Sequence, residues 1–291
     1  MVFKRVEAED FLVSADSVSQ TVWSNETVEL STFFTSSAQR VASLSGEYYL
    51  AVNQSATNVA GSTPQFDIAY GDKTSGGGVY FNDAVPGKST TSTIYGQYRT
   101  LVLEDEEKDF TFNSSYTPGY IYALSIERSR YKEKLLPGTL SLTLQGATGK
   151  ALTLTDNSND VTIPSYFGTQ RAYQIVRQGA NPGTSDAING GYTNSGSYGL
   201  FLPDIGTILL NGDALDVNAA SGLNLQTETS ANTPGSPVNS LKMWNAISGS
   251  GFFGLNSEET ITSDFVFVRA RNSEFNYSTN PSIITAQVEL G

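Results

Sequence analysis

Short stretches of alternating apolar and polar residues dominate this chain, and such alternation is typical of β-strands. Residues 65–70 and 139–144 alternate with period two, and residues 120–126 form a denser aromatic and aliphatic run. Residues 151–155 can pair with 139–144 as a hairpin over a glycine-containing turn. The pattern predicts an all-β or β-dominated fold of antiparallel sheets in sandwich-like units.

One short helix is predicted near residues 237–247. Ser236 is suited to cap it, Pro237 to open it and Gly249 to end it. The apolar side is supplied by Val238, Leu241, Met243, Trp244 and Ile247. Residues 94–103 fit either a helix or a strand, and Asn211–Gly212 is a sequence typical of a type I′ hairpin turn.

We expect three parts in the 291 residues: an N-terminal arm or edge strand over 1–21, a first β unit over 22–155, and a second β unit over 156–291 that can share a core with the first. Segments 72–93, 179–198 and 219–236 are rich in small polar residues or glycine and are predicted to be long loops.

The composition removes several classes of function. The chain has no His and no Cys, which excludes disulfides, thiolate chemistry and the commonest transition-metal ligands. The net charge of −12 argues against nucleic-acid binding, since phosphate contacts need a basic surface. No secretion signal or apolar run of membrane-spanning length is visible, so we expect a soluble protein made in a cytoplasm, with no membrane partner.

Two acidic patterns in the sequence contain residue types that can bind calcium or catalyse hydrolysis. Asp156, Ser158 and Asp160 have the spacing of a calcium loop, but Val161 and Phe167 stand where glycine and a bidentate glutamate belong, which favours an Asx turn. The second pattern is a set of carboxylates available for glycoside hydrolysis, Glu258, Glu259 and Asp264, which nothing in the sequence pairs at catalytic distance. We predict no catalytic site, no metal and no cofactor.

A basic stretch follows the apolar run at 120–126. Its cations alternate by two and would line one face of a strand: Arg128, Arg130, Lys132 and Lys134. Two interpretations stay open. The stripe either neutralises the acidic turn at 104–107 or forms a contact with another subunit, for which arginine is well suited.

A second predicted strand that is followed by basic residues lies near the C-terminus, at residues 265–270. Phe265, Phe267 and Arg269 are expected on one side, with the aliphatic residues on the other side facing the core. The turn that follows contains Arg271, Phe275 and Tyr277, which are residue types enriched at protein interfaces. We predict a docking element here, and the alternative is that a second sheet of the same chain covers the two phenylalanines.

These segments resemble a known family. Seven segments occur in this order: VWSN, FFTSSAQ, SGEYYLAV, FDIAYG, YGQYR, IYALSIERSRYKEKLLPGTLSLTL and FVFVRARNSEFNYSTNP. Over residues 22–281 the chain resembles virion structural proteins of contractile-tailed bacteriophages, especially T-even-like phages of cyanobacteria. The resemblance implies a non-enzymatic tail or baseplate subunit located in the virion. Its expected partners are other virion proteins and copies of itself.

Two alternatives remain open. One is a capsid-surface or neck fibre protein, and the other is a carbohydrate-binding host adhesin. Exposed aromatic clusters in the glycine- and serine-rich loops would favour the adhesin, whereas strand edges and arginines covered by other chains would favour the structural subunit.

Overall fold

A computed structural model describes residues 7–35, 49–74, 90–112, 117–147, 149–161, 163–179, 196–216, 223, 225 and 239–268. The chain divides into two compact units: residues 19–259, and residues 1–18 together with 260–291. The boundary expected near residue 155 falls inside the larger unit. Strand β8 (Ala151–Asp156) crosses that position, and the main core takes residues from both sides of it.

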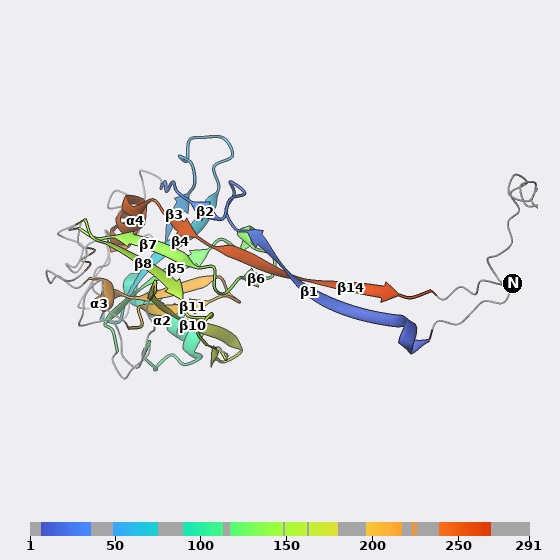
Figure 1. Cartoon of the computed structure of the whole chain (residues 1–291). Coiled ribbons are helices and arrows are strands. Elements are labelled where there is room, and N and C mark those ends of the chain that lie inside the picture. Colours follow the sequence, from blue (N-terminus) through green and yellow to red (C-terminus); the bar gives the residue numbers. More distant parts are fainter. Residues whose placement is uncertain are drawn as a thin grey trace, which may run out of the picture. The chain divides into compact units, whose positions relative to one another are not determined.

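The described part of the larger unit is built on an eleven-stranded sheet whose named strand pairs are all antiparallel (Figure 1). Its strands are, in sheet order, β2 (Glu29–Leu30), β13 (Phe253–Gly254), β7 (Ser141–Gln145), β8, β10 (Gln170–Arg177), β11 (Gly199–Leu202), β12 (Thr207–Asn211), β5 (Tyr120–Ile126), β4 (Pro64–Asp72) and β3 (Leu50–Asn53), with β9 (Ser165–Phe167) beside β10. The predicted β-dominated, antiparallel fold is confirmed.

The sheet curls until its two end strands come close. The chain leaves β2 and reaches Phe34, whose amide and carbonyl both bond to Asn53 at the end of β3, at 2.8 and 2.7 Å. The Thr32 hydroxyl also donates to the carbonyl of Gln54. These bonds satisfy backbone groups that an open edge would leave unpaired.

The central strands are buried on both faces, which explains why their sequences are nearly continuous apolar runs. Along β5, Tyr122 and Leu124 join the larger hydrophobic cluster, while Ile121 and Ala123 join a second cluster on the other face. Strand β12 alternates in the same way, with Leu210 in the larger cluster and Leu209 in the second.

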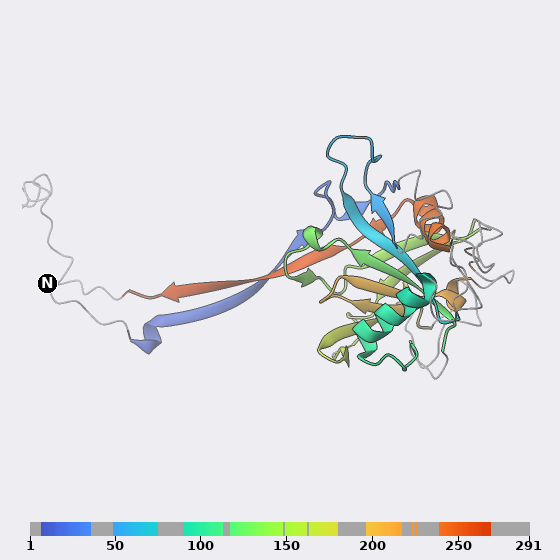
Figure 2. The same ribbon diagram turned by 180° about the vertical axis from the view of Figure 1, so that it is seen from behind.

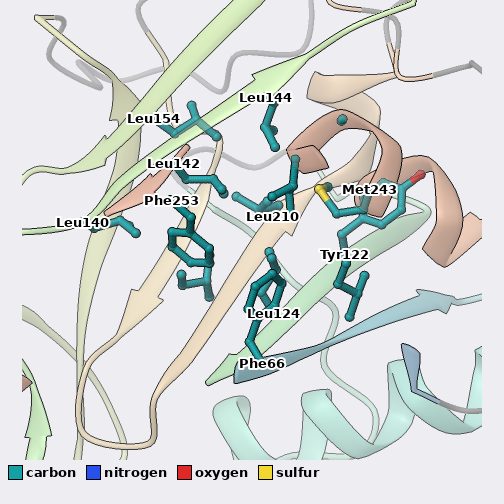
Figure 3. Packing of buried hydrophobic residues seen from close by; sticks show 14 of the residues in the cluster. Phe66, Tyr122, Leu124, Leu140, Leu142, Leu144, Leu154, Leu210, Met243 and Phe253 are labelled. Carbon is teal, nitrogen blue, oxygen red and sulfur yellow. The ribbon is translucent and has the colours of Figure 1, made fainter. Parts of the chain in front are cut away.

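The larger cluster fills the inside of the curl (Figure 3). Phe66 of β4 and Phe253 of β13 meet edge to face at 5.3 Å, and Trp23 packs on Phe253 at 4.9 Å between ring centroids. Helix α4 (Asn239–Ser250) contributes Met243 and Ile247 to this cluster. The predicted helix near 237–247 is therefore confirmed, and its expected cap Ser236 lies outside the described residues.

Helix α2 (Thr90–Leu103) covers the other face of the sheet (Figure 2). Its residues Ile94, Tyr95, Tyr98 and Val102 are buried in the second cluster, a spacing of three to four residues that fits a helix. This settles the segment 94–103, for which helix and strand were both open.

Outer strands β7 and β8 are apolar on one face only. Leu142 and Leu144 point into the core with Leu152 and Leu154, whereas Thr143 and Thr153 bond to each other at 3.0 Å on the opposite face. The predicted hairpin is confirmed. The predicted turn at Asn211–Gly212 is wrong, because the Asn211 side chain instead accepts from the amide of Ala214 and caps the short helix α3 (Gly212–Leu215).

Candidate assembly interface

The smaller unit contains most of a two-stranded antiparallel ribbon, visible in Figures 1 and 2 as β1 (Phe11–Thr21) beside β14 (Asn256–Val266). Residues 19–21 of β1 and 256–259 of β14 belong to the larger unit. A short 3-10 turn, Ala8–Asp10, precedes β1, and its Asp10 carboxylate accepts from the Glu7 amide at 3.3 Å. The Phe267 amide donates to the Asp10 carbonyl at 2.8 Å, which sets these two residues opposite each other.

None of the described residues of this unit, 7–18 and 260–268, is buried. Of the fifteen large hydrophobic side chains that are exposed in the described part of the chain, nine lie in these two segments: Phe11, Leu12, Val13, Val18, Ile261, Phe265, Val266, Phe267 and Val268. An apolar concentration of this kind is unusual on a free surface and marks sites of association.

Both faces of the ribbon are apolar near its end. Phe265 and Val266 point to opposite faces, yet they are 48% and 49% exposed. The prediction that the aliphatic side of this strand faces the core is therefore wrong. The structure describes no second layer over residues 7–18 and 260–268, and isolated two-stranded ribbons are only marginally stable in water.

The described ribbon residues carry acidic charges without basic ones. Segments 7–18 and 260–268 contain Glu7, Glu9, Asp10, Asp16 and Asp264 and no lysine or arginine. A partner must therefore keep its own carboxylates away from these positions or supply cations.

The basic stretch does not form the expected strand. Residues Arg128–Arg130 form a 3-10 turn, and only Lys134 and Leu135 are in a strand, β6 (Lys134–Leu135). The turn is held by Arg128, whose guanidinium lies 4.6 Å from the ring centre of Tyr131 and donates to the carbonyls of Tyr131 and Lys132.

The two lysines of this stretch pair with β14 inside the larger unit. Lys132 meets Glu259 at 2.7 Å and Lys134 meets Glu258 at 3.5 Å. They therefore neutralise these glutamates, two of the three carboxylates considered for glycoside hydrolysis. Arg128 and Arg130 stay predicted contact residues, and Arg269, Arg271, Phe275 and Tyr277 lie outside the described residues.

A buried polar cluster, which the sequence did not indicate, joins four elements of the larger unit. The Asp216 carboxylate accepts from the hydroxyls of Tyr120 and Tyr122 at 3.1 and 3.2 Å, and the Lys242 ammonium lies 3.6 Å away. Tyr70 packs against both tyrosine rings and donates to Asp72. Lys242, on α4, has no exposed side-chain surface.

Burial controls the ionisation of this cluster. Desolvation raises the pKa of Asp216, against the opposing effects of Lys242 and the two hydroxyls, and it lowers the pKa of Lys242. The pKa values of Tyr70, Tyr120 and Tyr122 are raised above 10.0 by burial first and by Asp216 or Asp72 next. Because the Lys242 side chain is fully enclosed and faces Asp216, we interpret the cluster as a structural connection.

The calcium-like loop is an Asx turn. Asp156 accepts from the amides of Ser158 and Gly138, which uses its carboxylate for backbone bonds. Among the described residues, no group of three or more carboxylates is arranged to hold a metal ion. None of the helices in that part of the chain is both long and apolar enough to cross a membrane.

Comparisons of the chain with protein-family models, with curated proteins and with solved structures found no match.

Proposed function

We propose that this chain is a non-enzymatic structural subunit of a bacteriophage virion, located in the tail or baseplate or its attached fibres, and that it acts through protein–protein contacts. The observation that carries the proposal is the ribbon of β1 and β14. The two strands and the two residues that follow β14 present nine exposed large hydrophobic side chains, and none of the described residues within 7–18 and 260–268 is buried.

The free energy available from burying these side chains is large enough to support binding of a partner protein. Fully burying a side chain of the Val, Leu or Phe type is worth about 1.5–3 kcal/mol, so covering nine half-exposed ones is worth about 7–13 kcal/mol before the costs of association. A term of this size can offset the loss of translational and rotational freedom on binding. The tail location rests on the family resemblance of residues 22–281.

The proposal is tested with a double variant, Leu12→Ser with Phe265→Ser. The variant is encoded in a phage genome, and the particles assembled from that genome are purified. Both side chains are about half exposed, so the isolated subunit should melt as the wild type does. Incorporation of the variant, measured by quantitative mass spectrometry of purified particles, should fall by about tenfold or more, which corresponds to about 1.4 kcal/mol of lost contact.

Val59→Ser is the matched control, since Val59 is exposed to a similar extent in the larger unit. It should be incorporated normally. If the protein is not found in purified particles, or if the double variant is incorporated as well as the control, the proposal is wrong.

A further inference from the structure

Among the strands that the structure describes, β1 lies at one edge of the three-stranded sheet β1-β14-β6 and has β14 as its neighbour. Edge strands of soluble proteins are usually protected by lysine, proline or a bulge. The eleven residues of β1 contain neither lysine nor proline, and one charge, Asp16.

We infer that a second copy of this chain occupies this edge, so that two β1 strands pair antiparallel about a twofold axis at Ala15. The inference rests on the proposed function, because it names the partner of the same ribbon. The resulting sheet would run β14-β1-β1-β14 across the two copies, with both β1 edges satisfied.

The backbone decides which residues can pair. The carbonyls of Asp10 and Gln20 both accept from groups at the β14 side, namely the Phe267 amide and the Ser257 hydroxyl. Backbone groups alternate in direction along a strand, so even-numbered residues of β1 face β14 and odd-numbered residues face the edge away from β14. Two copies can therefore form hydrogen-bonded pairs only between odd-numbered residues.

Side chains then select the register. A twofold axis at Ala15 sets Leu12 opposite Val18 of the partner copy, and these are exposed apolar residues of the same face. It also sets Asp16 opposite Ser14, which separates the like charges. Shifting the axis to residue 16 places Asp16 opposite itself, and shifting it to residue 14 places Asp16 opposite Leu12. Among these neighbouring registers, the axis at Ala15 alone avoids both conflicts.

The absence of cysteine makes this register directly testable by disulfide cross-linking of the full chain. In Ala15→Cys the two cysteines face each other across the axis, at a Cα separation of about 5.5 Å, which a disulfide can span. In Val13→Cys, the matched control on the same edge, the two positions are offset by four residues, about 13 Å, which is too far.

After mild oxidation, Ala15→Cys should run as a covalent dimer on a non-reducing gel at about ten times the yield of Val13→Cys or more, because only the cysteines at position 15 lie within the reach of a disulfide. Equal yields for the two variants, or no dimer from Ala15→Cys, would overturn the inference.

Sedimentation velocity supplies a second, independent measurement. The wild type should form a dimer as its concentration rises, and Ala15→Pro, which removes an amide that faces the edge away from β14, should weaken that dimer by about tenfold or more. Ala15→Val keeps the amide and should dimerise. A wild type that stays monomeric overturns the self-pairing. The proposed function is tested by incorporation into particles, which is a separate measurement. A monomeric wild type would therefore overturn the self-pairing and leave the proposed function standing, and failed incorporation would overturn the proposed function whether or not the chain dimerises.

Discussion

Replacing Asp216 with alanine removes the carboxylate that Lys242 faces in the core. The Lys242 side chain has no exposed surface, and Asp216 also accepts from the hydroxyls of Tyr120 and Tyr122. Breaking a buried ion pair costs about 3–5 kcal/mol, and each hydroxyl that loses its acceptor costs about 1–3 kcal/mol if nothing replaces it. These costs overlap because Lys242 can lose its proton, so we expect a loss of about 4 kcal/mol.

Lys242→Met removes the other partner and should cost less, about 1–2 kcal/mol. Methionine fills a similar volume, and Asp216 keeps two hydroxyl donors at 3.1 and 3.2 Å. Its raised pKa also favours the neutral acid, which needs no cation. Combining both substitutions should recover part of the loss, since the double variant leaves no buried charge facing an apolar residue.

Urea unfolding at pH 7, followed by circular dichroism and tryptophan fluorescence, measures these differences. Asp160→Ala, at an exposed position, is the control and should stay within about 0.5 kcal/mol of the wild type. If Asp216→Ala costs less than about 1 kcal/mol, or no more than Lys242→Met, the cluster is not the buried connection we describe.

Three further outcomes are expected. The pKa values of Tyr70, Tyr120 and Tyr122 are raised in the folded protein, so these tyrosines lose their protons in the unfolded chain first as the pH rises above 10. Their contribution to stability is therefore present below pH 10 and is lost above it. The urea midpoint should fall above pH 10, and it should fall less steeply in Tyr122→Phe. Gly199→Ala should destabilise by about 2 kcal/mol or more, since its Cβ would lie 2.0 Å from the Leu209 carbonyl oxygen, whereas Gly96→Ala in α2 meets nothing within 4 Å and should stabilise by about 0.5–1 kcal/mol; equal melting temperatures would contradict this. Lys132→Ala should cost less than about 1 kcal/mol by urea unfolding, because its pair with Glu259 is largely solvated, and a larger loss would show that the pair does more than we infer.

Local patterns in the sequence determined much of the larger unit. The predicted strands at 65–70, 120–126, 139–144 and 151–155 correspond to β4, β5, β7 and β8, and the one predicted helix corresponds to α4. These elements were predictable because alternation and capping act between residues close in sequence. The segment of α2 was ambiguous because β-branched and aromatic residues that favour strands, such as Ile94 and Tyr98, occupy helical spacing there.

Tertiary structure decided the rest, because it depends on contacts between distant residues. The alternating cations at 128–134 fit a strand, but Arg128 closes a turn over Tyr131, and Lys132 reaches Glu259, 127 residues later. Asp216 meets Tyr120 across 96 residues, which no local pattern encodes.

The exposure of the ribbon residues was also decided by the tertiary structure. Residues 11–18 alternate loosely in sequence, and the sequence alone suggested only an arm or an edge strand. Whether the apolar residues of β1 and β14 are buried or exposed depends on whether another layer covers them. The structure pairs these strands and places no described layer over residues 7–18 and 260–268, which is why the candidate interface emerged from the fold rather than from the sequence.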